Sequence, residues 1–573
     1  MSHTGHPIRW RLLDSDYLAA ERMAGEIGVS SLAARLLLNR GLSDCGEARS
    51  FLAPSLESLH DPGLLPDMDA GTERVARAIA DGEHICVHGD YDVDGITSTA
   101  LLVRTLKALG ANVSYRIPHR RRGGYGIKPC TVDELAAQGA SLIITCDCGV
   151  AAVDTVERAN ELGVDVVITD HHEPSGPLPQ AVAVIDPKRH DSAYPFPSLA
   201  GVGVAYKFGQ ALARRLGHSE ASFQSKFVDL AALGTVADVV PLLGENRVLV
   251  SAGLQAIPSS KKVGIRSMVR STGMTEKQIT AYHLGYVFGP RINAVGRMDD
   301  ASLALRLFIT SDESEAETLL REMERLNLER RTVQERVFVE AMAQCESLDL
   351  AARRVLVLSG DDWDVGVIGV VAGKIREHLR RPTIMIARDE MDGVGHGSAR
   401  SIESFHMLEA LSACSDTLLR YGGHALAAGL KLSLDRLDEF EHRINEIGLE
   451  LIAEDELVPT VDIEAEISLD EVTERVAEEI ARFEPFGVGN PEPLFALRGV
   501  TVLQKQLVGD GSHLKLLVGQ GDSRTVGCIG FGLAGYAPSL EIGGSADLCC
   551  SIRFNHFNGN SSVQLNLTDI VPN

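Results

Sequence analysis

The sequence lacks the features of a secreted or membrane-bound protein. No apolar run approaches the roughly 20 residues that a membrane-spanning helix needs, and the polar start (Met1–Asp16) has no apolar signal region. The ten cysteines show none of the regular spacing of a disulfide framework, which is typical of a reducing compartment. These absences predict a cytoplasmic protein without a membrane partner.

Two features of many nucleotide-dependent and DNA-binding proteins are also missing. The chain has no G-x-x-x-x-G-K-[ST] loop, so nothing in it indicates ATP hydrolysis. It has no overall excess of positive charge, because its formal net charge is −24, and this argues against non-specific binding of duplex DNA over the whole surface. A local basic groove would still be sufficient for a nucleic-acid substrate.

The composition indicates a globular chain of several domains. Its 573 residues, 45% of them hydrophobic, are enough for about 4 domains with their own cores. Two predicted helices (Tyr17–Glu26 and Ser31–Asn39) indicate a helical N-terminal region over 1–75. Strands and helices then alternate, which predicts an α/β domain with a doubly wound parallel sheet over 76–309.

Three further regions are expected after this sheet. A charged helix with apolar residues at 3/4 spacing is predicted over 310–346 and would act as a rigid connector. Residues 347–453 have the pattern of a second α/β domain. After an acidic linker, residues 459–573 contain short strand-like runs separated by Gly and Asn turns, which indicates a small β-barrel, with an OB-fold as the first choice.

The stretch His84–Ile96, H-I-C-V-H-G-D-Y-D-V-D-G-I, carries much of the predicted chemistry. Its apolar start predicts a buried strand. Three alternating carboxylates then follow at Asp90, Asp92 and Asp94. So much negative charge in so short a segment is unfavourable unless a cation or solvent compensates it. Carboxylates suit hard divalent metals, and His88 could add a nitrogen ligand for Mn²⁺ or Zn²⁺, although the stretch alone could be a solvated acidic loop.

Repetition of this pattern favours the metal site. Ser141–Cys146 and Asp165–Thr169 are two further apolar runs of strand type. Asp147 follows the first, and Asp170-His171-His172 follows the second. Because parallel strands end at the same edge of an open α/β sheet, where ligands bind, these side chains are expected to converge. The sequence therefore predicts a metal centre at that edge.

A basic loop is expected beside this centre. Between Val113 and Val132 the sequence contains several arginines and no acidic residue. The loop follows a predicted strand, so it should lie at the same edge of the sheet. We interpret it as a clamp for a phosphate backbone that includes Arg120, with Tyr125 available to stack on a base. A flexible basic surface loop is the alternative.

Glycine-containing clusters elsewhere provide further candidate ligands for a nucleic acid. The segment Gly289–Asp300 contains Arg291, Asn293 and Arg297. Comparable clusters in the second α/β region contain Ser398, Arg400, Ser401 and His424. Glycine allows the backbone to approach a ligand closely, and serine, arginine and histidine are suitable donors for a phosphate. Each cluster alone is a weak signal.

The D-H-H triplet (Asp170–His172) together with H-G-D-Y-D-V-D-G resembles the DHH phosphoesterase superfamily. Several further motifs are similar to those of its bacterial members that digest single-stranded DNA from the 5′ end. They are Gly234–Leu242 (G-T-V-A-D-V-V-P-L), Gly289–Arg297 (G-P-R-I-N-A-V-G-R), Gly422–Gly429 and Phe486–Pro493 (F-G-V-G-N-P-E-P). The similarity extends from about residue 50 to the C-terminus, and the ordered set is far more specific than any one motif.

The resemblance implies an architecture and a set of metal ligands. It implies a DHH domain, a connecting helix, a DHH-associated domain and an OB-fold, which agrees with the regions predicted above. One metal would be bound by Asp92 with either His88 or Asp90. The other would be bound by Asp94, His171 and Asp238, and Asp147 would bridge the two. Without the resemblance, Asp238 would be interpreted as a helix cap.

The resemblance also implies roles for residues around the metals. His172 would contact the scissile phosphate, and Asp170 would orient its neighbours. The chain departs from the superfamily pattern at two positions of the associated domain. It has Asp364 where histidine is usual and Ala399 where glycine is usual. Because both positions lie in the associated domain, these departures would affect binding of the substrate and not the metal chemistry.

The implied activity is 5′→3′ hydrolysis of single-stranded DNA to 5′-mononucleotides by two divalent ions, Mn²⁺ or Mg²⁺, without a protein nucleophile. Ser398, Arg400 and His424 would hold the 5′ end, and Arg291 and Arg297 would line the cleft. Likeness to these exonucleases also implies a role in DNA repair and recombination, with single-strand-binding protein and a helicase as partners, and we expect a monomer. Two alternatives stay open: a DHH phosphodiesterase for short oligonucleotides or cyclic dinucleotides, and a non-catalytic replication scaffold.

Overall fold

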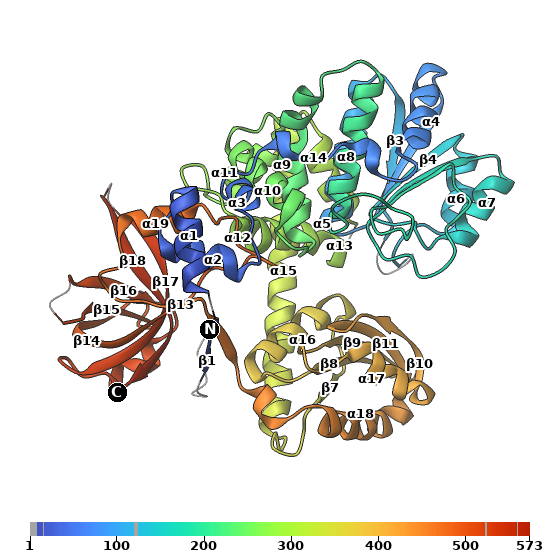
Figure 1. Ribbon diagram of the computed structural model, residues 1–573. Coiled ribbons are helices and arrows are strands. Elements are labelled where there is room, and N and C mark those ends of the chain that lie inside the picture. Colours follow the sequence, from blue (N-terminus) through green and yellow to red (C-terminus); the bar gives the residue numbers. More distant parts are fainter. Residues whose placement is uncertain (1–7, 15, 120–123, 299, 522–523, 558–559) are drawn as a thin grey trace. The chain divides into compact units, whose positions relative to one another are not determined.

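The computed structural model describes residues 8–14, 16–119, 124–298, 300–521, 524–557 and 560–573. The chain folds into two compact units, whose helices and strands are labelled in Figure 1. The first unit comprises residues 42–327 and 482–492, and the second comprises the described parts of 1–41, 328–481 and 493–573. No helix within these described ranges has both the length and the apolar character that a membrane crossing would require.

The first unit is built around a parallel sheet with the strand order β3-β2-β4-β5-β6. Its strands are β2 (His84–Gly89), β3 (Asn112–Arg116), β4 (Leu142–Cys146), β5 (Asp165–Thr169) and β6 (Ala183–Ile185). Both faces are covered, because successive strand residues point to opposite sides. Leu142 and Ile144 pack into one core, whereas Ile143 packs into another. This confirms the predicted doubly wound α/β sheet.

The strand order creates a topological switch point between β2 and β4. The chain runs from β2 to β3 on one side, whereas β4 pairs with β2 on the other side. Ligands of open α/β sheets bind at the carboxyl ends of the strands at such a point. In this chain these two strand ends are followed by Asp90–Asp94 and by Asp147.

Helices make up most of the rest of the first unit. They are α3 (Cys45–Leu52), α4 (Met68–Ala80), α5 (Val93–Ala108), α6 (Pro129–Ala137), α7 (Val153–Glu161), α8 (Gly201–Arg215), α9 (Glu220–Ala237), α10 (Gly244–Ala256), α11 (Val263–Ser271), α12 (Ala281–His283), α13 (Gly289–Met298) and α14 (Ser302–Ile309). Helices α4, α5, α8 and α9 contribute to the core on one face of the sheet, and α6 and α7 to the core on the other. Helix α9 ends at Asp238, which places this carboxylate beside the strand ends.

The long connecting helix predicted from the sequence is α15 (Glu313–Glu346), with 34 residues and a length of about 50 Å. Asp312 begins the helix, because its side chain accepts a hydrogen bond from the Ser314 N–H at 2.7 Å. The two halves of the helix contribute to different cores. Leu319 and Met323 belong to the core of the first unit, and Val337 belongs to a core of the second.

The second unit contains a mixed sheet with the strand order β10-β11-β9-β8-β7. Its strands are β7 (Leu356–Gly360), β8 (Thr383–Asp389), β9 (Val394–Arg400), β10 (Leu418–Gly423) and β11 (Ala427–Ser433). Its helices are α16 (Val365–Leu379), α17 (Met407–Ala413) and α18 (Leu437–Leu451). Helix α16 packs on one face and the other two on the opposite face. A second α/β region is therefore confirmed.

The C-terminal strands form a closed barrel, because β14 pairs with both β15 and β17. The barrel strands are β14 (Phe495–Val508), β15 (His513–Gly519), β16 (Val526–Gly530), β17 (Ser545–Phe557) and β18 (Asn560–Pro572). The short strand β13 (Ala465–Glu466) and helix α19 (Glu474–Ala481) precede them. The predicted small barrel is confirmed.

The N-terminal segment contains one strand that the sequence analysis missed. Strand β1 (Arg9–Leu12) pairs in parallel with β12 (Thr460–Ile463). Its sequence, R-W-R-L, alternates basic with apolar residues over only four positions, which is too short to distinguish a strand from a loop. The two predicted helices are present as α1 (Tyr17–Ile27) and α2 (Ser31–Asn39).

Candidate active site

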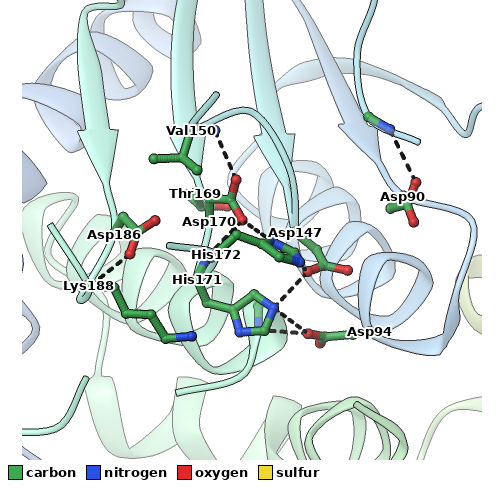
Figure 2. Close-up of polar contacts among 12 residues, drawn as sticks. Asp90, Asp94, Asp147, Val150, Thr169, Asp170, His171, His172, Asp186 and Lys188 are labelled. Atoms are coloured by element: carbon green, nitrogen blue, oxygen red, sulfur yellow. Dashed lines mark hydrogen bonds and ion pairs between the residues drawn. The ribbon is translucent and has the colours of Figure 1, made fainter. Parts of the chain in front are cut away.

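The candidate active site lies at the carboxyl edge of the parallel sheet, where side chains from the ends of neighbouring strands turn toward one another (Figure 2). Two groups of potential metal ligands form there, each with its ligand atoms within 4.8 Å of one another. One group is Asp94, His171 and Asp238, and the other is Asp147, His171 and His172. His171 is common to both, so it is the centre of the arrangement.

The imidazole of His171 is oriented by the backbone. Its Nδ1 lies 3.1 Å from the carbonyl oxygen of Leu199, and because a carbonyl can only accept, Nδ1 carries the proton. The lone pair of Nε2 therefore faces the carboxylates. Nε2 lies 3.1 Å from Asp147 Oδ1, 3.7 Å from Asp238 Oδ2 and 3.9 Å from Asp94 Oδ2. Burial, followed by the charge of His172, lowers the pKa of His171 to about 4, so the ring is neutral and able to bind a metal.

Asp94 is fixed by the N-terminus of helix α8. Its two carboxylate oxygens accept hydrogen bonds from the Gly201 N–H at 2.6 Å and the Val202 N–H at 2.7 Å. Only glycine fits at the first of these positions, because a Cβ there would lie 2.8 Å from Asp147 Cβ and 2.9 Å from Asp94 Oδ2. The G-V-G sequence at the start of α8 thus allows the helix to approach two of the carboxylates at once.

Asp147 occupies an unusual backbone conformation. Its φ is +59°, in the left-handed region that non-glycine residues rarely adopt and that is enriched at functional sites. The turn that follows β4 directs its carboxylate toward both histidines, with Oδ1 4.0 Å from His172 Nδ1. This oxygen has no hydrogen-bond partner among the described residues.

Asp170 lies behind the two histidines and supports them. One of its oxygens accepts the Val150 N–H at 2.9 Å, and the other accepts the His171 N–H at 2.8 Å and lies 2.7 Å from His172 Nδ1. Burial lowers the pKa of His172, but the hydrogen bond and charge of Asp170 outweigh it, so the net shift is upward. Conversely, burial alone would raise the pKa of Asp170. Its contacts with His172 and Val150 outweigh burial, so the pKa of Asp170 lies below its ordinary value.

The other three predicted ligands do not form a comparable group. Within the described residues, no set of three close ligand atoms includes His88, Asp90 or Asp92. The His88 ring is fully buried, and neither of its nitrogens has a hydrogen-bond partner in the described part of the chain. Asp92 caps helix α5 through the Gly95 N–H at 3.0 Å. Asp90 lies apart from Asp94 in Figure 2, with Oδ1 3.5 Å from the Gly126 nitrogen.

The electrostatics of the cluster favour a cation. Burial is the largest cause of each shift and the neighbouring carboxylates add to it, so the pKa of Asp94 rises to about 7 and that of Asp238 to about 9. Burial and the charges of Asp94, Asp92 and Asp238 also raise the pKa of Asp147 well above its ordinary value. Ionised together, these groups are unfavourable unless positive charge compensates them.

The donor set also fits a divalent ion. Asp147 Oδ1, His171 Nε2 and Asp238 Oδ2 are all buried ligand-type atoms, and none has a hydrogen-bond partner among the residues described. Buried polar atoms in native proteins are nearly always paired, so such a cluster of unpaired ones needs an explanation. Carboxylate oxygens with one or two imidazoles suit Mn²⁺ and Mg²⁺ better than a thiolate site would.

Lys188, which follows strand β6 at the same edge, is not among the site residues predicted from the sequence. Figure 2 shows its side chain extending toward His171. The ammonium group makes no hydrogen bond or ion pair with a described residue, but its charge lowers the pKa of Asp238. Asp186, two residues earlier, is buried, and burial raises its pKa to about 7. The sequence does contain a pattern that indicates this segment, because A-V-I followed by D-P-K repeats the arrangement of a strand followed by an acidic residue. The apolar run is too short to be distinguished from a loop by sequence alone.

The predicted basic loop is described only in part. Arg120 lies outside the described residues. The hydroxyl of Tyr125 donates to the Asp147 carbonyl at 3.0 Å and lies 3.1 Å from His172 Nδ1. The two rings meet edge to face, with centroids 5.5 Å apart. Tyr125 is therefore part of the site, with one side of its ring against His172.

Helix α13 carries the predicted Arg291, Asn293 and Arg297 past the site. Its Gly296 faces the backbone of Tyr91, where a Cβ would lie 2.9 Å from the Tyr91 carbonyl oxygen. Arg291 is half-buried and forms an ion pair with Glu324 at 2.6 Å. Part of its guanidinium is thus used within the protein.

The remaining predicted donors lie in the second unit. On β9, Ser398 and Arg400 face the start of α16, where a Cβ at Gly369 would lie 2.7 Å from Ser398 Oγ and 3.2 Å from Arg400 Nη2. His424 is exposed in the turn between β10 and β11. Strand β11 begins at Ala427, which pairs with Arg400 in the register of the sheet. Ser401 is buried, and its hydroxyl donates to the Phe405 carbonyl at 2.6 Å.

The two departures from the superfamily pattern have structural explanations. Asp364 begins α16, where its side chain accepts the Gly366 N–H at 2.7 Å. An aspartate is among the best residues for this capping position. The methyl group of Ala399 is fully buried in the core of the second α/β region. Both residues therefore stabilise the scaffold that carries Ser398 and Arg400.

Comparison with known families gives three matches in chain order. Residues 84–235 match the DHH family, N-terminal domain. Residues 352–448 match the DHHA1 domain, and residues 463–569 match the RecJ OB domain. The first match contains the candidate metal ligands up to His172, and the second contains Ser398, Arg400 and His424.

Individual relatives cover nearly the whole chain. The single-stranded-DNA-specific exonuclease RecJ of Bacillus subtilis is 33% identical over 98% of this chain and 70% of its own length. The crystal structure of Thermus thermophilus RecJ in complex with Mn²⁺ has a TM-score of 0.84 at 32% identity and covers 98% of this chain and 79% of the relative. The Mg²⁺ complex gives 0.78 at 30% identity over 98% and 78%. These matches, together with the order of the three domains, show that the chain belongs to the RecJ family of single-stranded-DNA-specific exonucleases.

Proposed function

We propose that this chain hydrolyses single-stranded DNA in the 5′→3′ direction and releases 5′-mononucleotides. The observation that carries the proposal is the group Asp94, Asp147, His171 and Asp238 at the switch-point edge of a parallel sheet. Buried carboxylates with unpaired oxygens are suited to bind metals that hydrolyse phosphodiesters. Membership of the RecJ family supplies the substrate class.

Two divalent ions, Mn²⁺ or Mg²⁺, are the cofactors in this proposal, as they are the ions bound in the Thermus RecJ crystal structures. Asp94, His171 and Asp238 would hold one ion, Asp92 with His88 or Asp90 would hold the other, and Asp147 would contribute to both. When bound, such a pair supplies Lewis acidity that activates water and neutralises charge on the phosphate.

The chain's own residues would orient the substrate beside the ions. Asp170 holds His172 through a contact of 2.7 Å to Nδ1, which leaves Nε2 as the atom available to the scissile phosphate. The Tyr125 hydroxyl restricts the same ring. The Lys188 ammonium, which has no ion-pair partner among the described residues and extends toward His171, would supply positive charge where negative charge develops during hydrolysis.

The second unit would hold the end of the strand. We propose that Ser398, Arg400 and His424 bind the 5′-terminal phosphate, with Ser401 fixing the end of β9. Arg291, Asn293 and Arg297, together with Arg120 of the basic loop, would contact the strand backbone. The barrel would keep hold of the strand between cleavage steps, as OB-folds do with single strands.

The cellular setting follows from the same reasoning. Its partners would be single-strand-binding protein and a helicase that exposes single strands during DNA repair and recombination. None of the ten cysteines forms a disulfide, which supports a cytoplasmic location. We expect the working form to be a monomer.

A nuclease assay with single strands labelled at either end tests the proposal. With Mn²⁺ or Mg²⁺, a 5′ label should leave first as a mononucleotide, and the matching duplex should stay intact. Asp147→Asn should abolish the reaction, because it removes a buried carboxylate from the cluster. The matched control is Asp133→Asn on the exposed face of α6, which should act like the wild type.

Two results would overturn the proposal. Cleavage of dinucleotides without any release from long strands would indicate a DHH phosphodiesterase for short substrates. Strand binding without hydrolysis in either metal, unchanged in Asp147→Asn, would indicate a non-catalytic scaffold.

A further inference from the structure

Two exposed tyrosines stack on each other close to the candidate active site. Tyr282 and Tyr286 have ring centroids 4.9 Å apart and an interplanar angle of 26°. Their exposed fractions are 64% and 72%, so each ring leaves most of its surface to solvent. Large aromatic side chains usually bury their surface and are enriched where ligands bind.

The helix that carries the tyrosines is a continuous run from α12 through a π-helical segment, η4 (Leu284–Phe288), into α13. Leu284 and Phe288 of this segment are buried, so packing explains one side of the helix. The other side carries the two tyrosines. A π-helical turn inside such a run is uncommon, and it occurs frequently at functional sites.

This helix runs along the active site. A Cβ at Gly285 would lie 3.6 Å from Val236, and one at Gly289 would lie 3.8 Å from Ala237. These contacts place the tyrosine-bearing segment against the last turn of α9, directly before Asp238. The other end of the run reaches Tyr91 through Gly296. The tyrosine pair is therefore continuous with the surface of α13 that we propose for the strand.

We propose that Tyr282 and Tyr286 form a stacking platform for bases on the 3′ side of the cleaved bond. The inference rests on the proposed function. An enzyme that removes one nucleotide at a time from the 5′ end has a single nucleotide on the 5′ side of that bond, so further contacts must be with the 3′ side. Every base has a π-face, so stacking holds a strand without regard to its sequence.

An abasic scan of the substrate tests this platform. Single strands of constant length would carry one abasic nucleotide at successive positions from the 5′ end, and kcat/KM for release of the first nucleotide would be measured. With wild-type protein, one or two positions should lower kcat/KM about 5- to 150-fold, which corresponds to roughly 1–3 kcal/mol per stacked base. In the double variant Tyr282→Ala/Tyr286→Ala, the intact strand should show that loss, and the abasic nucleotide should add nothing to it.

Two further variants separate stacking from a structural role. Tyr282→Phe/Tyr286→Phe retains both rings and should retain the wild-type abasic pattern. Tyr17→Ala removes a similarly exposed tyrosine, 61% exposed, from helix α1 and should change nothing. The value of kcat at saturating strand should be the same in all of these proteins, because none of the changes touches the metal ligands.

Three results would overturn the inference. One is an abasic pattern in the alanine variant that matches the wild type. Another is a wild-type protein that shows no sensitive position. The third is a wild-type dimer in sedimentation that the alanine variant loses, which would assign the tyrosines to a contact between copies of the chain. Absence of any release by the wild type from intact strands would instead overturn the proposed function, and this inference with it.

Discussion

At the scale of single residues, Gly201 is the position where the site is most sensitive to one added atom. A Cβ there would lie 2.8 Å from Asp147 Cβ and 2.9 Å from Asp94 Oδ2, both closer than side chains pack. We expect Gly201→Ala to displace these carboxylates and to lower Mn²⁺ affinity and nuclease activity by about 10- to 100-fold. Metal titration by calorimetry and the strand assay measure the two effects.

The control for this variant is Gly176→Ala, because a Cβ at Gly176 would have no neighbour within 4 Å. It should bind metal and cleave DNA like the wild type. Normal Mn²⁺ affinity in Gly201→Ala would mean that the start of α8 can move away, and that its approach to Asp94 is not needed for the site.

Lys188 gives a second prediction at this scale. Its ammonium is directed toward His171 and makes no ion pair with a described residue. We expect Lys188→Ala to lower kcat by about 10²-fold, as the loss of one group that stabilises developing charge does, without weakening Mn²⁺ binding, because a positive charge beside the proposed ligands disfavours a bound cation. Lys188→Arg should restore part of the rate. An equal loss in Lys107→Ala, at the exposed end of α5, would show that the effect is not specific to the site.

These residues also show where prediction from sequence succeeded and failed. Asp94, Asp147 and His171 could be predicted to converge, because each lies in the short segment after a strand-like run and parallel strands share an edge. Asp238 follows a helix, so its position required the family resemblance. Tyr282 could not be distinguished from a core tyrosine, because exposure depends on which face of a helix the rest of the chain covers.

At the scale of elements, strands and helices with a strong apolar period were predicted well, and weakly patterned ones were not. The barrel strands were recognised from their apolar centres. Strands β17 and β18 have 13 residues each and are longer than these apolar centres. Their pairing continues through polar residues, which do not show the alternating apolar pattern by which a strand is predicted. Strand β1 depends on its partner β12, about 450 residues later, for its hydrogen bonds.

The segment 482–492 supplies a prediction at the element scale. It belongs to the first unit although it is separated from the rest in sequence, and Arg247 holds it. The buried guanidinium donates to the carbonyls of Phe483 at 2.8 Å, Arg482 at 2.9 Å and Phe51 at 3.0 Å. We expect Arg247→Ala to leave these acceptors unpaired and to cost on the order of 3 kcal/mol of unfolding free energy.

Hydrogen exchange measures this effect directly, because the amides of 482–492 should exchange faster in Arg247→Ala while those of strand β4 change less. Arg247→Lys keeps the charge but cannot make all three bonds, so it should show an intermediate effect. Arg270→Ala, an exposed arginine on α11, is the control. Unchanged exchange in 482–492 would show that the segment is held by its apolar contacts alone.

At the scale of the whole molecule, the same charges that bind metal weaken the metal-free fold. A carboxyl whose pKa is higher in the folded than in the unfolded protein opposes folding once the pH exceeds its unfolded value. Burial and mutual repulsion raise the pKa of Asp94 to about 7 and of Asp238 to about 9, so at neutral pH both carry this penalty. Divalent ions should remove it by binding only the folded state.

Mn²⁺ should therefore raise the unfolding temperature of the unit that contains the site, whatever the DNA substrate. At a free concentration 100 times Kd, one ion stabilises the fold by about 2.7 kcal/mol, which corresponds to roughly 4–5 °C for a unit of this size. Asp147→Asn should lose most of this shift. Its metal-free form should melt at or above the wild-type temperature, because the substitution removes a buried charge that neighbouring carboxylates repel. A metal-free variant that melts well below the wild type would mean that the Asp147 carboxylate stabilises the turn after β4, and that the cluster is not under electrostatic strain.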